Sequence, residues 1–93
     1  MNQQSAENIA VAALGFLAAE QARLQRFLDL SGLEAGSIRA AAADPQFLAG
    51  VLDYIHTDET LLTTFAASID IDPTTVERAR AALIGPTWER DAP

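Results

Sequence analysis

The feature that most constrains this chain is an internal repeat, because Leu14 recurs as Leu52 and much of the second half echoes the first at that same shift. The identical pairs are Leu14/Leu52, Leu24/Leu62, Phe27/Phe65, Ala41/Ala79 and Ala43/Ala81. Similar residues recur as Ile9/Phe47, Ala13/Val51, Phe16/Tyr54, Leu17/Ile55, Leu33/Ile71, Glu34/Asp72 and Ile38/Val76. A period of about 20 to 50 residues is typical of helical repeats, whose units cover each other's apolar faces. The pattern predicts two three-helix units packed together.

The length of 93 residues allows one compact domain and leaves no room for a second core. With 49% hydrophobic and 20% charged residues, the chain is too apolar for intrinsic disorder. We expect a single helical domain over residues 1–86, followed by a tail over residues 87–93. The tail holds the one tryptophan, Trp88, which either folds back onto the bundle or is loose.

Six helices are expected from the apolar periodicity, and no segment alternates with the period of two typical of strands. The first three are expected at about residues 5–19, 20–30 and 34–43. The others follow the aspartates of Asp44-Pro45, Asp58 and Asp72-Pro73. Aspartate caps free N–H groups at a helix start, and proline is tolerated in the first turn. The fold class predicted is therefore all-α, a compact bundle of about six short helices.

The ends of the helices also carry signals. Ser5 is the expected N-cap of the first helix. Gly32 is expected to end the second helix, since glycine tolerates the left-handed conformation found there. Gly85-Pro86 is expected to end the sixth, which gives a last helix over residues 73–84.

The predicted core consists of apolar residues that share helix faces. Its members are Ile9, Ala13, Phe16, Leu17, Leu24, Phe27, Leu28, Ile38, Phe47, Val51, Tyr54, Ile55, Leu61, Leu62, Phe65, Ile69, Val76, Ala79 and Leu83. Asp53 and His56 are expected on the opposite side of their helix. Val11 and Leu14 extend the apolar surface of the first helix around much of its circumference, which places that helix in the middle of the bundle.

The charge is strongly acidic, with 13 Asp and Glu against six basic residues, all arginine, and a net charge of −7. Because non-specific DNA binding gains most of its affinity from cations on phosphates, this balance argues against nucleic acid and against anionic membranes. The chain has no cysteine, which excludes disulfides, thiolate chemistry and Cys-ligated metals. The apolar stretch over residues 9–19 is shorter than a membrane span needs. By elimination, a cytoplasmic location is expected.

Several short runs resemble a family of short bacterial proteins known as a domain of unknown function. The runs are Gly15-Phe16-Leu17, Arg26-Phe27-Leu28, Ser31-Gly32-Leu33, Asp44-Pro45-Gln46-Phe47-Leu48, Val51-Leu52-Asp53, Asp58-Glu59, Leu62, Phe65-Ala66, Ala79-Arg80 and Leu83. The resemblance covers residues 9–83 and implies a small all-helical protein. It implies no activity, ligand or site residue.

No constellation in the sequence indicates catalysis or a metal centre. His56 lies near Asp53, Asp58 and Glu59, but metal sites usually need three or four committed ligands, so we interpret it as a solvated histidine at a helix C-terminus. The four serines share one candidate base and lack a nucleophile motif. A calcium loop at Asp70 and Asp72 would also need ligands that the following residues do not supply, so cap and turn roles are expected there. We therefore predict no enzyme, no metal and no cofactor.

One segment, residues 66–76, looks like a helix-turn-helix whose second helix could enter a DNA major groove. The helix over 73–84 would then read the DNA, with Thr74, Thr75 and Arg78 as its contacts and Arg80 as a further cation. Asp70 and Asp72 would lie beside phosphates, and the electrostatics therefore argue against this interpretation.

The function expected from these observations is a small protein-interaction or adaptor module. Its partner is expected to be another protein, one rich in Arg or Lys, or a second copy of the chain. No small-molecule substrate is indicated. Nucleic-acid binding through the last helix is the alternative.

Overall fold

The computed structural model describes the backbone of residues 1–91 and the side chains of residues 1–34 and 36–84. Within that range the chain forms helices and no strand, so the all-α prediction is confirmed. The elements are α1 (Gln3–Ala18), α2 (Gln21–Ser31), the 3₁₀ turn η1 (Ala35–Ser37), α3 (Ile38–Ala41), α4 (Pro45–His56), α5 (Glu59–Ser68) and α6 (Pro73–Asp91).

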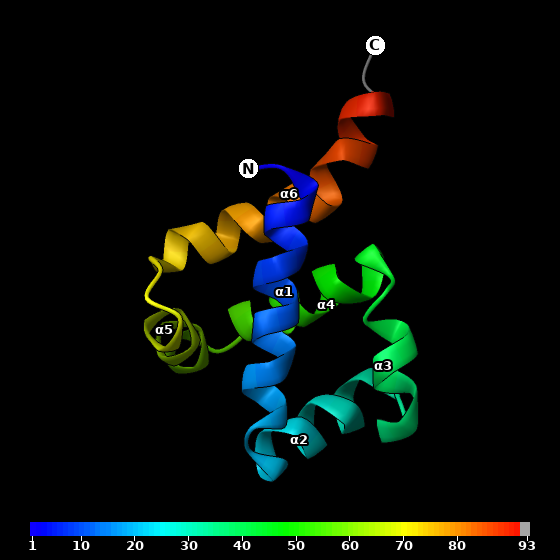
Figure 1. Cartoon of the computed structure of the whole chain (residues 1–93), viewed down its shortest axis with the longest axis vertical. Helices are drawn as coiled ribbons and strands as arrows, with labels where there is room; N and C mark the ends of the chain where they lie inside the picture. The colour runs from blue at the N-terminus through cyan, green and yellow to red at the C-terminus, as the bar shows by residue number, and fades with distance from the viewer. Residues whose placement is uncertain (92–93) are drawn as a thin grey trace.

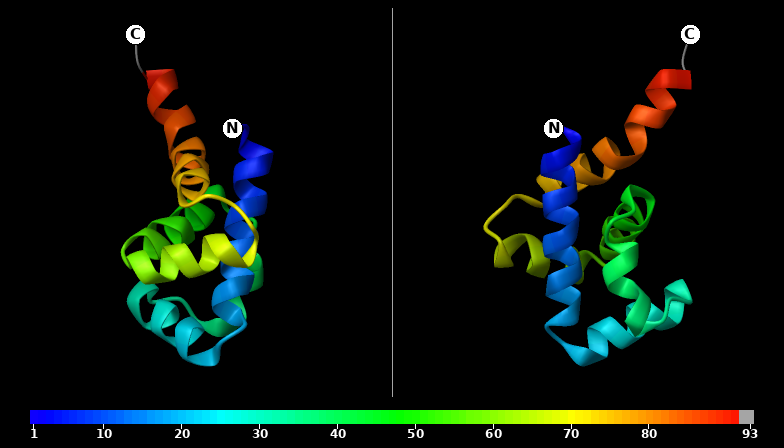
Figure 2. Two further views of the ribbon diagram at one scale, coloured as in Figure 1. Left: turned by 90° about the vertical axis from the view of Figure 1, so that its left-hand side faces the viewer. Right: turned by 45° about the vertical axis from the view of Figure 1, so that its right-hand side comes forward.

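α1 runs along one side of the molecule, and α2, α4 and α6 pack against its buried face (Figures 1 and 2). Its N-terminal end lies beside α6, and α2 crosses at its C-terminal end (Figure 2). Direct contacts join α1 to α2, α4 and α6, whereas α5 packs against α4 and α6. The sequence placed the first helix in the middle of the bundle because Val11 widens its apolar surface, but Val11 is 49% exposed and α1 keeps one face open to solvent.

The start of α1 differs from the prediction. The N-cap is Asn2, whose side-chain oxygen accepts the N–H of Ser5 at 2.8 Å, so Ser5 lies inside the helix instead of capping it. Both residue types cap well, and the earlier start adds the first turn that carries the buried Ala6. The aspartate starts are confirmed: Asp44, Asp58 and Asp72 accept the N–H groups of Gln46, Leu61 and Thr74 at 2.9, 3.2 and 2.9 Å.

The helix ends agree with the sequence in one place and differ in two. Gly32 ends α2 with a φ of 73°, as predicted. The third helix is shorter than the predicted range of residues 34–43, because η1 precedes an α3 of one turn. Gly36, a poor helix former, lies in η1.

The prediction that Gly85-Pro86 ends the last helix is wrong, since α6 extends to Asp91. Proline lacks one N–H donor but keeps a helical φ, so it need not stop a helix. The side chain of Trp88 lies outside the described residues.

The core is built around small side chains on α1 and larger ones on the surrounding helices. Ala6, Ala10 and Ala13 are fully buried and allow the neighbouring helices to approach closely. Buried residues facing them include Phe27, Leu28, Leu48, Val51, Leu52, Ile55, Phe65, Val76 and Ala79. Most of the predicted core residues are buried or packed against this cluster, whereas Val11 is 49% exposed.

The repeat remains a prediction, although local features recur at its spacing. Phe27 and Phe65 are both buried, and so are Leu14 and Leu52. The two residues with positive φ, Gly32 and Asp70, occupy the same place in the repeat, after α2 and after α5. The third elements differ, because α3 has four residues and α6 has 19.

Candidate interaction surface

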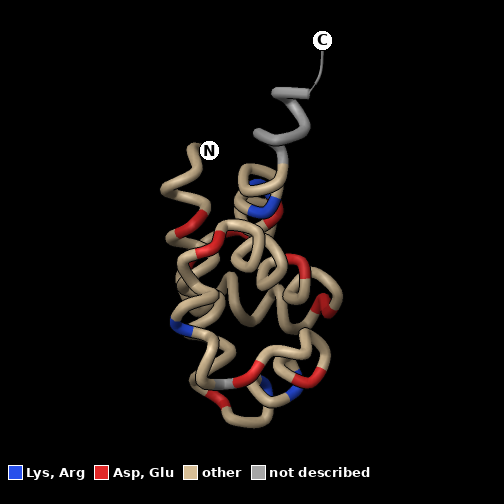
Figure 3. The backbone as a smooth tube through the Cα atoms, turned by 90° about the vertical axis from the view of Figure 1, so that its right-hand side faces the viewer, with Lys and Arg blue, Asp and Glu red and all other residues tan. Residues whose placement is uncertain are grey.

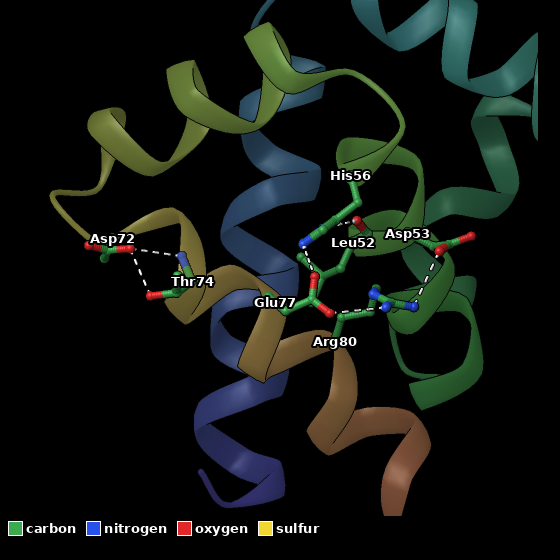
Figure 4. A network of polar contacts seen from close by, with 7 residues as sticks. All are labelled: Leu52, Asp53, His56, Asp72, Thr74, Glu77 and Arg80. Carbon is green, nitrogen blue, oxygen red and sulfur yellow. Dashed lines mark hydrogen bonds and ion pairs between the residues drawn. The ribbon is translucent and has the colours of Figure 1, made fainter.

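A network of charged side chains joins α4 to α6 (Figure 4). Glu77 on α6 lies at its centre: one carboxylate oxygen is 2.7 Å from Nε2 of His56, and the other accepts a hydrogen bond from Arg80 at 3.2 Å. Arg80 also donates to Asp53 on α4, at 3.4 Å. Because α4 and α6 also pack through apolar side chains, the network fixes the rotation of one helix against the other.

The prediction of a solvated His56 is wrong. Its side chain is only 17% exposed, and its Nδ1 lies 3.1 Å from the main-chain oxygen of Leu52, one turn back in α4. Both ring nitrogens therefore face acceptors, and both contacts are satisfied when both nitrogens carry protons. The partner is Glu77, which is distant in sequence and was not among the carboxylates that the sequence suggested.

The environment of Glu77 favours its ionised form. The hydrogen bond from Arg80 is the largest cause of a pKa below the ordinary value of 4.5, and the charges of Arg80 and His56 lower the pKa further. Asp72 also has a lowered pKa, because its carboxylate accepts hydrogen bonds from the backbone N–H and the hydroxyl of Thr74. Both carboxylates have structural contacts that explain their shifts.

The sequence predicts no metal centre and no nucleophile. The structure describes the side chains of residues 1–34 and 36–84. Among those residues, no group of three or more His, Cys, Asp or Glu side chains is placed to hold a metal ion. The hydroxyls of two serines donate hydrogen bonds to main-chain oxygens one turn back in the helix. Ser31 donates to Leu28, and Ser68 donates to Phe65. These hydroxyls are therefore engaged in helix-end contacts.

Three neighbouring hollows follow the exposed edge of α4, and together we call them the α4 groove. The first, of about 430 Å³, lies between α4 and α6 and is lined by Gln46, Ala49, Gly50, Asp53, Leu83 and Ile84. The second, of about 260 Å³, lies between α4 and α2 and is lined by Phe27, Leu30, Ser31, Gly50, Asp53, Tyr54 and Thr57. The third, of about 330 Å³, reaches the start of α5 and is lined by Arg26, Leu30, Tyr54, Thr57, Asp58, Glu59 and Thr60.

The hollows share lining residues, so they adjoin one another along α4. Gly50 and Asp53 line both the first and the second, and Leu30, Tyr54 and Thr57 line both the second and the third. Sequence reasoning missed this surface because its walls come from four helices that are not contiguous in the chain. The one available signal was Gly50, a glycine in the middle of an apolar helix.

The α4 groove combines exposed apolar side chains with negative charge. Leu30 is 70% exposed and Ile84 is 47% exposed, so two of the most exposed large apolar side chains flank it. Asp53, Asp58 and Glu59 are exposed along it, and Arg26 is the one cation among the residues with described side chains that line it. Acidic positions also outnumber basic ones over the described backbone as a whole (Figure 3).

The residues suggested for DNA contact lie together near the start of α6, but only part of the set faces outward. Thr74 and Arg78 are exposed, and Thr75 is half-buried. The hydroxyl of Thr74 donates to Asp72 at 2.7 Å. Arg80, the second cation of that interpretation, is held by Asp53 and Glu77.

The fold and this surface define a small all-helical domain with an acidic, partly apolar groove. Residues 3–86 match the family described as "Protein of unknown function (DUF3572)", and the chain belongs to that family. Neither the curated proteins nor the solved structures contain a match to this chain. No helix among the described residues is both long enough and apolar enough to cross a membrane.

Proposed function

We propose that this chain is a non-catalytic protein-interaction module that acts in the cytoplasm. The observation that carries the proposal is the α4 groove, where exposed apolar side chains lie beside a row of carboxylates. Apolar patches rimmed by polar residues are typical of protein-binding sites. Leu30 and Ile84 are the apolar members of this arrangement.

The placement of the titratable residues favours binding over catalysis. His56 and Glu77 contact each other and neighbouring helices, and neither lines the α4 groove. A general acid or base has to reach a bound substrate, whereas these groups hold two helices together. The carboxylates that do line the groove are exposed and spread along it.

The test is capture of a protein partner by the full chain in living cells. A tagged chain is cross-linked in cells and purified, and the mass of the untagged chain is measured in parallel by sedimentation equilibrium. We expect one protein to be recovered reproducibly and its capture to fall as salt rises, because acidic surfaces attract basic partners through screened charges. Recovery of no protein, together with a monomeric mass in solution, would contradict the proposal.

A further inference from the structure

We infer that the α4 groove binds one amphipathic helix from a basic partner protein. The inference rests on the proposed interaction function, and it adds the surface, the conformation of the ligand and its charge.

The shape of the groove suits an elongated ligand. Gln46, Gly50, Asp53 and Thr57 are exposed at spacings of four, three and four residues, so they form one stripe along α4. At 1.5 Å per residue this stripe is about 16 Å long, which corresponds to three turns of a bound helix. The three hollows lie along it in succession, and a compact small molecule would fill only one of them.

Gly50 keeps the middle of the groove open. A Cβ atom at this position would meet no heavy atom within 4 Å, so the space above it is free. Because Gly50 lines both the first and the second hollow, a long side chain there would project into the space where the two adjoin. Glycine is a poor helix former, and an open path for a ligand is a physical reason for its presence in α4.

The walls offer apolar anchors on both sides. Leu30 on α2 and Leu83 and Ile84 on α6 line the hollows. In the second hollow, beside Leu30, the rings of Phe27 and Tyr54 pack edge to face, with centroids 5.2 Å apart. A helix with apolar residues at spacings of three and four inserts its side chains into grooves of this kind.

A helix fits better than an extended segment. Extended peptides add to the free edge of a sheet, and residues 1–91 contain no strand. The main-chain groups of α4 are bonded within the helix, so side chains have to provide the contacts. Side-chain contacts spaced along one stripe are what an amphipathic helix supplies.

The charges of the groove select a basic ligand. Asp53, Asp58 and Glu59 provide three carboxylates, whereas Arg26 is the one cation among the described residues that line the hollows. One carboxylate oxygen of Asp53 accepts a hydrogen bond from Arg80. One carboxylate oxygen of Asp58 accepts a hydrogen bond from the N–H of Leu61. Both remain exposed and can accept further hydrogen bonds. A second copy of this chain would bring another net charge of −7, so a different, basic protein is the favoured occupant.

The experiment uses two synthetic helical peptides about 14 residues long with the same leucine stripe, one flanked by lysines and one flanked by glutamates. Each is titrated into the ¹⁵N-labelled full chain, and amide shifts and affinity are recorded. We expect the lysine peptide to saturate the protein with shifts at Gly50, Thr57 and Thr60, and to bind at least about tenfold more tightly than the glutamate peptide. Its affinity should fall as salt rises.

The decisive variant is Gly50→Gln, which fills the middle of the groove with a neutral side chain. Its matched control is Gly15→Gln on α1, since Gly15 is also an exposed helical glycine with free space around its Cβ position. We expect Gly50→Gln to weaken binding of the lysine peptide by about tenfold or more and Gly15→Gln to leave it within about twofold. Circular dichroism of both variants checks that the helices are intact.

Other results would overturn the inference. Failure of the lysine peptide to saturate, equal affinity of the two peptides, or equal effects of the two glutamine variants would each do so. A dimer of the chain that dissociates in Gly50→Gln would identify a second copy as the occupant and would also overturn it. If a cellular partner is captured equally well by Gly50→Gln, the interaction function stands and this surface is wrong. If no partner is captured at all, the interaction function itself fails.

Discussion

At the scale of single residues, Glu77 is the centre of the polar contacts between α4 and α6. Its two oxygens bind different partners, His56 and Arg80, and Arg80 extends the contact to Asp53. A surface ion pair alone contributes little to stability, but a network such as this one, in which His56, Glu77 and Arg80 each have two partners, holds its geometry better. Removing this carboxylate interrupts the chain of contacts at its centre.

We expect Glu77→Gln to lower stability at neutral pH and to have a smaller effect in acid. The pKa of Glu77 is lowered in the folded state, so its ionised form stabilises the fold above the unfolded pKa of 4.5, and this contribution is lost as the pH falls below that value. The measurement is urea unfolding of both proteins at pH 7 and at about pH 3. Glu59→Gln, outside the network, is the control. An effect of Glu77→Gln that is equal at the two pH values would contradict the assigned role.

Among the residues whose side chains are described, Phe65 is the largest that is fully buried, and it is the clearest test of the core. Its ring lies 5.5 Å from that of Phe16, between α5 and α1. We expect Phe65→Ala to reduce the free energy of unfolding by about 3 to 5 kcal/mol, since a large cavity remains. Phe65→Leu should cost clearly less because it keeps most of the volume. Urea titration measures both, and a loss below about 1 kcal/mol for the alanine variant would show that Phe65 is not part of the core.

The positions of single residues in the core could be predicted from the sequence where the apolar pattern alone determines whether a side chain is buried. Phe27 and Phe65 follow from the apolar pattern, and both are buried. The environment of His56 could not be predicted, because its partner Glu77 is 21 positions away and comes close only when α6 packs on α4. Sequence neighbours such as Asp53 and Asp58 were the natural candidates for the carboxylate partner of His56, but its partner is Glu77.

At the scale of elements, the starts of α4, α5 and α6 were predictable because a cap acts over two or three residues. The ends were less predictable. Gly32 gives a strong local signal, since its φ of 73° is costly for any residue with a Cβ. Gly85-Pro86 gives a similar signal at the sequence level, yet α6 continues to Asp91. A local residue pair such as Gly-Pro makes a helix end more favourable, but tertiary contacts can override this local preference.

Two glycines should respond in opposite directions to the same substitution. Gly32→Ala should destabilise the protein by about 1 to 2 kcal/mol, because alanine is strained in the left-handed conformation. Gly50→Ala should stabilise it by about 0.5 to 1 kcal/mol, because alanine is a better helix former and the space around its Cβ is free. Thermal unfolding of the two variants beside the parent chain measures both. Stabilisation by Gly32→Ala would contradict the conformation assigned to that turn.

At the scale of the whole molecule, the fold class followed from periodicity, whereas the packing of the helices did not. Apolar stripes indicate that a helix is buried on one side but do not name the helix that covers it. The contact of α1 with α6 therefore emerged only in three dimensions, and so did the α4 groove, whose lining comes from α2, α4, α5 and α6. Sequence reasoning could propose an acidic interaction module but could not propose the surface that would serve it.

The whole-molecule charge also separates protein binding from DNA binding. Residues 66–76 span the turn between α5 and α6, but Arg80 is engaged by carboxylates and Asp72 lies at the start of the helix that would enter the groove. With a net charge of −7, the chain should not shift duplex DNA of mixed sequence in a gel assay at about 0.15 M salt. Arg78→Ala should therefore change nothing in that assay. Binding that survives this salt and is weakened by Arg78→Ala would make α6 a reading helix, because loss of one phosphate or base contact then removes measurable affinity.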